Sequence, residues 1–366
     1  MPFAPESRAL YSRLRRWFAK HARPLPWRGQ TDPYRIWVSE VMLVQTTVAV
    51  GIKRYPRFLK RFPTLRSLAR ATLDDVMKEW EGLGYYHRAR YLHQAARIIQ
   101  DQYGGVFPSE YDEIRALPGV GDYVAAAVSN FCFGTRVPAI DANVARVGAR
   151  LFGITGGVRN GPVRAKVYRE LSKLMTVGNG AIWTDALIEV GALICSPRSP
   201  GCPSCPLTQN CRAFEKGHPD KYGMPEARTP RSEVQVACGI IRRGDGKILI
   251  AQRLETGLLP GLWEFPGGKQ QAREALAETC RREIEEELAI EVRIGRKRMV
   301  VRHAYSHYTV RLHVFDCVYL SGRPRKIGCQ NWRWVRPTEL HALAFPSANR
   351  AIIEAIGGIP TENSQS

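Results

Sequence analysis

Apolar residues recur at intervals of three and four positions along the first 214 residues, and runs that alternate between apolar and polar are few there. This period favours amphipathic helices over strands. Asp32 followed by Pro33 marks a helix start, because a capping carboxylate precedes a proline at the first helical position. Ser109 followed by Asp112 resembles a capping box ahead of Leu117. The first part of the chain is therefore predicted to be all-helical.

A second pattern begins after residue 232. Residues 215–232 are polar and rich in proline and charge, which predicts a linker. Beyond it we expect an α+β domain of about 130 residues. Its predicted elements are strands at Val234–Arg242 and Lys247–Arg253 joined by a turn at 244–246, a helix at about 271–288, strands at about 297–320 and 331–335, and a last helix near 347–357.

The charge of the chain narrows its class of partner. Among 366 residues, 54 Lys and Arg outnumber 34 Asp and Glu, which gives a net charge of +20. Such an excess indicates a polyanionic partner, most commonly nucleic acid. No apolar run approaches the length of about 18 residues that a membrane span needs. We expect a monomer in the cytoplasm, associated with the nucleoid if the source is bacterial.

Glu40 is a candidate general acid. Its helical neighbours three and four positions away are all apolar: Ile36, Trp37, Leu43 and Val44. A carboxylate facing such a stripe is desolvated, which raises its pKa and keeps it protonated near neutral pH. The alternative is a glutamate at the edge of the stripe that pairs with an arginine.

Asp141 is a second candidate carboxylate, although an Asp ahead of a helix is usually an ordinary N-cap. Two carboxylates could share the cleavage of a glycosidic bond. One would protonate the leaving group, and the other would support an oxocarbenium-like sugar.

Two glycine-rich turns are candidates for contact with DNA. Residues 117–121 (LPGVG) lie between helical stretches, and the backbone N–H groups of Gly119, Val120 and Gly121 can hold a phosphate without reading sequence. A plain tight turn is the alternative. Residues 82–86 (GLGYY) offer an aromatic side chain that could insert into a duplex and help to extrude a base.

Four cysteines form a candidate metal site. Cys195, Cys202, Cys205 and Cys211 have the spacing C-x6-C-x2-C-x5-C. Such a set can ligate zinc or an iron–sulfur cluster, and the presence of one short pair instead of two favours a cluster. The remaining cysteines (132, 238, 280, 317 and 329) lack such spacing and are expected in the core.

Together these motifs, with 25–28 (LPWR), resemble the helix–hairpin–helix DNA glycosylases, and within them the MutY-type adenine glycosylases. The resemblance implies a multidomain fold. Its expected parts are a six-helix barrel with the hairpin (30–129), a helical domain that holds a [4Fe–4S] cluster (1–29 and 130–214), the linker (215–232) and an α+β Nudix-like domain (233–360). The family removes adenine mispaired with 8-oxoguanine in double-stranded DNA.

The resemblance also implies roles for single residues. Glu40 would protonate the flipped adenine, Asp141 would stabilise the cationic sugar, and Asn143 would support both carboxylates. Tyr123 stands where lyase-type relatives carry a Schiff-base lysine, and a phenol cannot form that adduct, so we expect a monofunctional glycosylase. Residues matching the adenine pocket are Trp27, Arg28, Leu43 and Asp185; those matching the wedge into the duplex are Gln45 and Tyr85, with Thr46 and Leu83 beside them.

The chain departs from the family pattern at three of these sites. Val44 replaces a common glutamine, Ala142 replaces a glycine, and Asp185 stands where glutamate is common. These changes bear on the choice of the opposite base.

A second motif lies at 268–290 and resembles the Nudix box, with Ala289 in place of its last glycine. Glu283, Glu286 and Glu287 share one helix face, and three carboxylates together suit Mg²⁺ or Mn²⁺. A solvated acidic face is the alternative. A metal there could activate water against a pyrophosphate.

The C-terminal domain resembles two kinds of protein. Residues 303–307 resemble the MutY-type loop in which Ser306 and His307 would approach 8-oxoguanine, with Tyr305 for phenylalanine. Residues 345–349 resemble the segment with which MutT-type pyrophosphatases grip 8-oxoguanine nucleotides. Four hypotheses stay open: an adenine glycosylase, a bifunctional protein that also hydrolyses 8-oxo-dGTP, a glycosylase for another mismatch, and a mismatch-binding module without chemistry.

Overall fold

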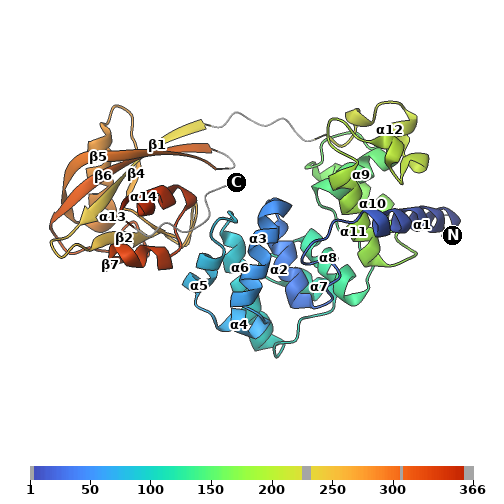
Figure 1. Ribbon diagram of the computed structural model, residues 1–366, viewed down its shortest axis with the longest axis horizontal. Helices are drawn as coiled ribbons and strands as arrows, with labels where there is room; N and C mark the ends of the chain where they lie inside the picture. Colours follow the sequence, from blue (N-terminus) through green and yellow to red (C-terminus); the bar gives the residue numbers. More distant parts are fainter. Residues whose placement is uncertain (1–3, 225–231, 306–307, 358–366) are drawn as a thin grey trace. The chain divides into compact units, whose positions relative to one another are not determined.

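The computed structural model describes residues 4–224, 232–305 and 308–357. The chain divides into two compact units, which we treat separately (Figure 1). The first comprises Met1–Arg70 and Tyr91–Arg228, and the second comprises Ala71–Arg90 and Thr229–Ser366. No helix among the described residues is long and apolar enough to cross a membrane.

The first unit is helical, as its hydrophobic period predicts. Its elements are α1 (Ala4–His21), α2 (Pro33–Leu43), α3 (Val48–Arg61), α4 (Leu65–Arg70), most of α6 (His87–Gln102), α7 (Tyr111–Ala116), α8 (Asp122–Phe133), α9 (Ala142–Phe152), α10 (Gly161–Leu174), α11 (Gly180–Leu193) and α12 (Arg212–Glu215), with short 3-10 turns at Cys202–Ser204, Thr208–Asn210 and Pro219–Lys221.

The N-termini of α2 and α7 show whether the N-caps predicted from the sequence are present. The side chain of Asp32 accepts hydrogen bonds from the N–H groups of Tyr34 and Arg35, which confirms the start of α2. The capping box predicted at Ser109 is wrong. Helix α7 has Glu110 as its N-cap, without a side-chain capping bond, and the Ser109 hydroxyl donates to the Glu110 carboxylate instead.

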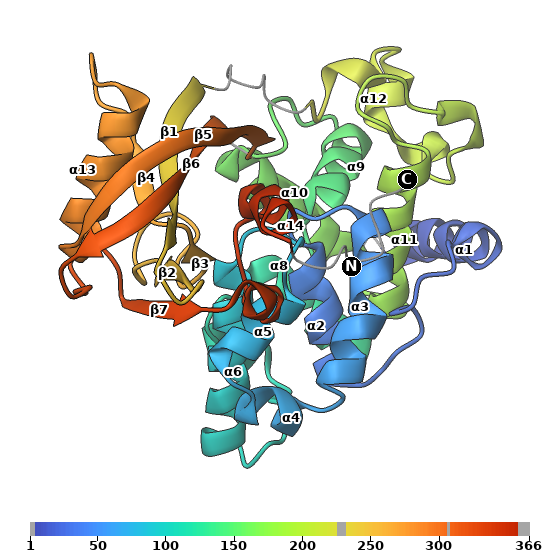
Figure 2. The same cartoon turned by 60° about the vertical axis from the view of Figure 1, so that its left-hand side comes forward.

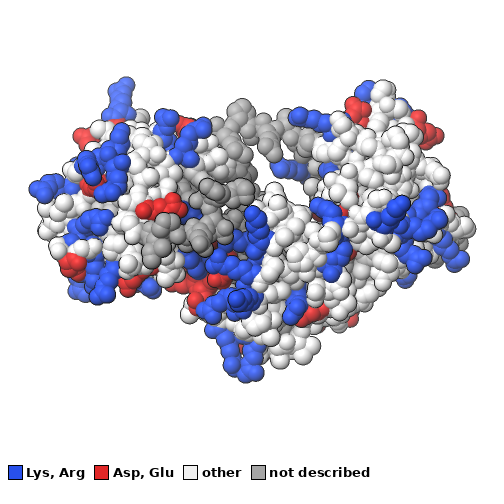
Figure 3. All heavy atoms as spheres, in the orientation of Figure 1, with Lys and Arg blue, Asp and Glu red and all other residues white. Residues whose placement is uncertain are grey.

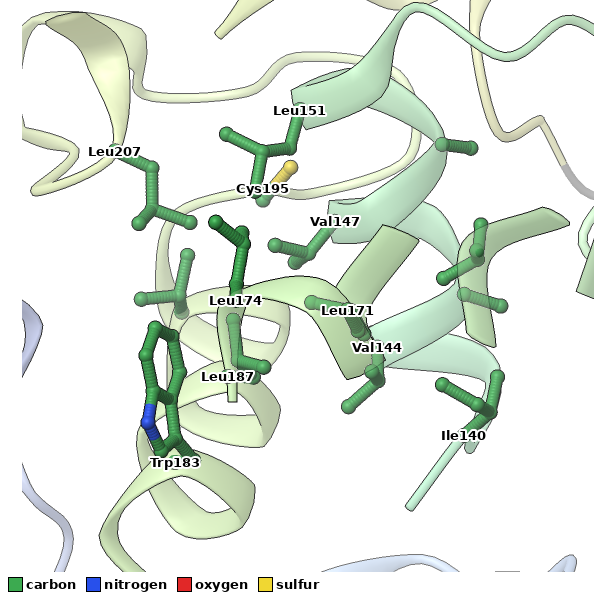
Figure 4. Packing of buried hydrophobic residues seen from close by; sticks show 14 of the residues in the cluster. Ile140, Val144, Val147, Leu151, Leu171, Leu174, Trp183, Leu187, Cys195 and Leu207 are labelled. Atoms are coloured by element: carbon green, nitrogen blue, oxygen red, sulfur yellow. The ribbon is translucent and has the colours of Figure 1, made fainter. Parts of the chain in front are cut away.

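One core of the first unit joins α1, α9, α10 and α11 (Figure 4). Val144 and Val147 from α9, Leu171 from α10 and Trp183 from α11 all belong to this cluster, and all four are buried. This packing fixes α9 relative to α11. Asp141 precedes α9 and Asp185 lies on α11, so the core sets the spacing between these carboxylates.

The second unit is built on a seven-stranded sheet with the order β3-β2-β1-β6-β5, in which β4 also pairs with β1 and β7 with β2. The central strands β1 and β6 are parallel, with Val234 opposite Val310. The strands are β1 (Ser232–Arg242), β2 (Ile248–Gln252), β3 (Trp263–Glu264), β4 (Gly267–Lys269), β5 (Glu291–Ala304), β6 (Tyr308–Ser321) and β7 (Asn331–Val335), and the helices are α5 (Leu73–Glu79), α13 (Leu276–Leu288) and α14 (Arg350–Ala355), with 3-10 turns at Pro337–Ala342 and Ser347–Asn349.

Helices cover both faces of this sheet (Figure 2). Cys280 and Ile284 of α13 pack into one core, and Ile352 of α14 packs into the other. The predicted α+β class is confirmed, with shifted boundaries: α13 begins later than residue 271, and β5 begins earlier than residue 297.

Candidate active site

Glu40 lies on the buried face of α2, and only 5% of the residue is exposed. The Tyr123 hydroxyl at the start of α8 donates a hydrogen bond to Glu40 Oε2 at 2.7 Å. Burial raises the pKa of Glu40 to about 7; the Tyr123 bond lowers it, while the charges of Asp185 and Asp141 raise it. The hydrogen-bond partner is thus a tyrosine and not the arginine of the alternative reading. Glu40 can hold a proton near neutral pH.

Asp141 is an N-cap, as its position ahead of a helix suggests. Its carboxylate accepts hydrogen bonds from the Val144 N–H at 2.6 Å and from Asn143 Nδ2 at 2.9 Å. Burial nevertheless raises the pKa of Asp141, although these hydrogen bonds and Arg146 lower it. Because the Asp141 charge raises the pKa of both Glu40 and Tyr123, the three groups interact across one site. Capping and a catalytic role are therefore compatible.

Asn143 is held on its other side by Arg146, which lies on α9. Arg146 Nη2 donates to Asn143 Oδ1 at 2.9 Å, and its Nε donates to the Cys195 carbonyl at 2.7 Å. The amide of Asn143 is thereby oriented with its Nδ2 toward Asp141. This chain of bonds leads from the cysteine segment to the carboxylate.

A cavity of about 70 Å³ opens beside Glu40. Six residues predicted from the sequence line it: Trp27, Arg28, Glu40, Leu43, Tyr123 and Asp185. Trp27 packs edge-on against Tyr55 with their ring centroids 5.6 Å apart, so the indole is fixed within the wall. These six residues thus offer aromatic surface, a guanidinium and two carboxyl groups to a ligand.

Glu189 also lines this cavity, and the sequence analysis missed it. Its side chain is 0% exposed, and Arg23 and Arg28 bind it. Arg28 Nη2 donates to Glu189 Oε1 at 2.7 Å and to Asp185 Oδ1 at 3.2 Å. Glu189 follows Asp185 by four positions on α11, so both lie on one helix face. That spacing was a signal in the sequence.

The predicted wedge residues have uncommon backbone conformations. Gln45 is exposed in the turn after α2 and has φ of +60°, and Tyr85 in the second unit has φ of +45°. Leu83, beside Tyr85, is buried, and Arg88 Nη2 donates to the carbonyl of Leu83 at 2.9 Å. Thr46 N–H bonds back across the turn after α2. Left-handed backbone is costly outside glycine and is kept where the surroundings enforce it, often at functional sites.

The hairpin joins α7 to α8. Gly119 has φ of +73°, and a Cβ there would lie 2.5 Å from the Tyr91 Cβ, so only glycine fits. Val120 is buried, and its carbonyl accepts from Arg115. Gly121 is the N-cap of α8 and has no atom within 4 Å of its ideal Cβ position. The backbone of this turn is held firmly and is open at Gly121.

Burial raises the pKa of Cys202, Cys205 and Cys211 of the predicted cluster, and the charge of Cys195 adds to each rise, so the four cysteines lie near one another. Burial raises the pKa of Cys205 to about 11, and the other three cysteines contribute to that rise. Among the described residues, no three such side chains are close enough to hold a single metal ion. Arg150 Nη1 lies 3.2 Å from Cys195 Sγ, and backbone N–H groups point at Cys205 and Cys211. These donors would stabilise thiolate charge, which ligation of a metal ion or an iron–sulfur cluster by these cysteines requires.

Within the second unit, the Nudix-like residues form an ordered arrangement. Arg282 Nε and Nη2 bind the two oxygens of Glu274 at 2.7 and 3.0 Å, and Arg282 Nη1 binds Glu283 at 3.0 Å and Glu286 at 2.9 Å. A Cβ on Gly268 would lie 2.0 Å from Glu283 Oε2. The carboxylate of Glu283 therefore occupies the space that a side chain at position 268 would need.

A cavity of about 420 Å³ in this unit is lined by Glu283 and Glu287 but not by Glu286. Burial and the nearby Glu264 raise the pKa of Glu287 to about 8. Glu264 is itself half-buried, is paired with Arg253 and lines the same cavity. It is a further carboxylate that the sequence analysis did not single out. Ser306 and His307 lie outside the described residues.

Comparison with protein families assigns a class to each region. Residues 38–175 match the HhH-GPD superfamily of base excision DNA repair proteins, and residues 237–355 match the NUDIX domain. The helical region also resembles the solved structure of a thermostable thymine-DNA glycosylase, with a TM-score of 0.53 and 29% identity over 59% of this chain and 100% of that one. The chain is therefore a base-excision repair glycosylase, a hydrolase of N-glycosyl bonds, that carries a Nudix-like domain.

Curated relatives that align with most of this chain indicate which kind of glycosylase it is. The adenine DNA glycosylase of Buchnera aphidicola from Acyrthosiphon pisum is 31% identical over 70% of this chain and 73% of its own length. The Homo sapiens adenine DNA glycosylase is 29% identical over 96% of this chain and 75% of its own. The chain belongs to the adenine DNA glycosylase family.

Proposed function

We propose that this protein removes adenine mispaired with 8-oxoguanine from double-stranded DNA. The observation that carries the proposal is Glu40, a carboxyl group with a pKa near 7 in a cavity that also presents Trp27 and Arg28. Residues 30–129 would form the barrel, and 1–29 with 130–214 the cluster domain. The excess of lysine and arginine on the surface (Figure 3) would bind the duplex without regard to sequence.

Glu40 and Asp141 divide the chemistry in this proposal. Protonated Glu40 donates its proton to the extruded adenine, at N7, while the N-glycosyl bond breaks. The carboxylate of Asp141 stabilises the positive charge that develops on the sugar, and Asn143 keeps that carboxylate oriented. Glu40, now ionised, then accepts a proton from the attacking water. Tyr123 positions Glu40 and forms no Schiff base.

Other predicted residues would position the DNA. The amides at 119–121 would hold a phosphate, and Gln45 and Tyr85, with Thr46 and Leu83 beside them, would enter the duplex at the lesion. Ser306 and His307 would approach 8-oxoguanine. Cys195, Cys202, Cys205 and Cys211 would ligate a [4Fe–4S] cluster, which would brace this end of the domain. We expect a monomer that works in the cytoplasm, where it meets chromosomal DNA.

The test is base release under single-turnover conditions from duplexes with adenine opposite 8-oxoguanine. We expect Glu40→Gln to abolish release, and Glu113→Gln, an exposed carboxylate on α7, to retain it. Release at the wild-type rate by Glu40→Gln would refute the role of Glu40. Duplexes with thymine or other bases at the mismatch distinguish a glycosylase for another mispair, and the absence of release from all of them would indicate a binding module.

A second activity is favoured by the cavity of the second unit, which Glu283 and Glu287 line together with half-buried Glu264. We infer that this unit also hydrolyses 8-oxo-dGTP. Glu283, Glu286 and Glu287 are hard oxygen donors that would hold Mg²⁺ or Mn²⁺, which supplies activation of water and charge for the phosphates. In the structure Arg282 engages Glu283 and Glu286, so metal binding would have to displace it.

Release of pyrophosphate from 8-oxo-dGTP tests this second activity. We expect turnover that depends on the divalent metal and is lost in Glu286→Gln. The control is Glu285→Gln on the same helix, since Glu285 is exposed and pairs with Arg281 instead. The absence of turnover by the wild-type chain with either metal would leave the second unit as a reader of DNA alone.

A further inference from the structure

Four charged side chains form a ladder along one wall of the cavity beside Glu40. In the order in which they pair they are Arg23, Glu189, Arg28 and Asp185, and their side chains are 31%, 0%, 16% and 25% exposed. Arg23 binds both oxygens of Glu189, at 2.9 and 3.0 Å. Arg28 then connects Glu189 to Asp185 through a single nitrogen, Nη2. With all four groups charged, the two arginines and the two carboxylates cancel.

Glu189 lies between the two arginines of this ladder and binds Arg28. The side chain of Glu189 is 0% exposed, whereas that of Asp185 is 25% exposed. Arg28 lies 2.7 Å from the Glu189 carboxylate and 3.2 Å from that of Asp185, so its bond to Glu189 is the shorter by 0.5 Å. Arg28 Nη1 is fixed at the Arg23 carbonyl at 2.6 Å. The guanidinium is thus drawn toward Glu189, and the charge of Asp185 is only partly neutralised.

Asp185 in turn acts on Glu40, since its charge raises the pKa of Glu40. The ionisable groups that face Glu40 across this site are Tyr123 on α8, Cys132 farther along α8, Asp141 ahead of α9, Asp185 on α11, and Arg28 in the segment before α2. Asp185 is connected through Arg28 to the further pair Glu189 and Arg23. A change of charge at Glu189 or Arg23 is therefore expected to reach Glu40 through Asp185.

We propose that Glu189 is a positioning residue for the glycosylase reaction: by binding Arg28 and Arg23, it keeps Asp185 incompletely neutralised and so favours the proton on Glu40. This inference rests on the proposed role of Glu40. It assigns to Glu189 no contact with the reacting bond. Because the ladder is balanced, the effect of each substitution on Glu40 has a sign that follows from the charge left behind.

Removal of the Glu189 carboxylate leaves an excess positive charge. In Glu189→Gln, Arg28 is free to bind Asp185 more closely, and the site loses one negative charge. Both changes weaken the repulsion that favours protonated Glu40. The alkaline limb of the pH–rate profile is expected to move to lower pH by roughly half a unit, which is less than the 1–3 units of a directly adjacent charge.

Removal of Arg23 is expected to shift the alkaline limb in the opposite direction. Arg23→Gln leaves an excess negative charge, so the alkaline limb is expected to move to higher pH by a similar amount, roughly half a unit. The double variant Glu189→Gln/Arg23→Gln restores the balance and is expected to return the limb close to its wild-type position. Opposite shifts that cancel are a pattern that damage to packing alone would not produce. Arg23 is 31% exposed in its side chain, so Arg23→Gln should fold even if Glu189→Gln does not.

The experiment measures the single-turnover rate of adenine release by the full chain between about pH 5 and pH 9, with Glu40→Gln as reference. If the alkaline limb stays at the wild-type pH in both single variants, or moves in the same direction in both, the proposed role of Glu189 is refuted. The proposed role of Glu40 as the acid would be unaffected by that result. A Glu40→Gln variant with the wild-type rate would instead overturn the proposed function. The two failures are therefore distinguishable.

Discussion

The burial that raises the pKa of Glu40, the proposed general acid, should also destabilise the folded chain. The pKa of Glu40 in the folded state is about 7, compared with 4.5 for an unperturbed glutamate. Between these two values the folded state binds a proton that the unfolded state has released. The free energy of unfolding therefore falls as the pH rises from about 4.5 to about 7, and then levels off.

The size of this effect follows from the two pKa values. At about 1.4 kcal/mol per pH unit, a rise from 4.5 to about 7 corresponds to about 3 kcal/mol. Glu40→Gln removes the ionisation but keeps an oxygen that can accept the Tyr123 hydrogen bond. The variant is therefore expected to be more stable than wild type by about 3 kcal/mol at pH 8, and nearly equal to it at pH 4.5.

Urea denaturation of both proteins at pH 4.5 and at pH 8, followed by the fluorescence of the tryptophans, measures this difference. The catalytic loss and the stability gain should appear in the same variant. The reasoning is refuted if Glu40→Gln is equally stable relative to wild type at the two pH values. That result would mean that Glu40 titrates as an ordinary exposed glutamate.

Three further perturbations have directions that the structure sets. Tyr123→Phe removes a hydrogen bond that lowers the pKa of Glu40, the proposed general acid. The alkaline limb of the pH–rate profile for base release should therefore move upward by about one pH unit, and a downward shift would contradict this. Gly119→Ala would force a contact with Tyr91 and should lower stability by about 1–3 kcal/mol, whereas Gly121→Ala should be nearly neutral; equal urea midpoints for the two would refute the steric argument. Ala289→Gly should stabilise the second unit by about 0.5–1 kcal/mol, because φ is +53° there, and a loss of stability in urea would show that the Ala289 methyl group packs favourably.

Local patterns in the sequence were sufficient to predict the helices of the first unit and the raised pKa of Glu40. The period of apolar residues predicted the helices of the first unit, and Asp32 with Pro33 predicted the start of α2 because both act within one turn. The apolar neighbours of Glu40 on that helix predicted its raised pKa for the same reason. Such inferences need no knowledge of the tertiary fold.

Contacts between distant segments were beyond a local pattern. Tyr123 is 83 positions from Glu40, and Arg28 is 161 positions from Glu189, so only the packing of α2, α8 and α11 brings these groups together. Ser109 shows the converse limit. Its motif was adequate for a cap, but α7 begins at Tyr111, and the hydroxyl bonds to Glu110 instead.

The close approach of Glu283 to the backbone of Gly268 has a consequence for how such domains change over time. A methyl group at position 268 and a carboxylate at position 283 cannot occupy the same space. In any descendant, a residue bulkier than glycine at position 268 would push the flexible end of the Glu283 side chain aside. The residue at position 268 should therefore determine where the Glu283 carboxylate can lie, and so whether that carboxylate can still serve.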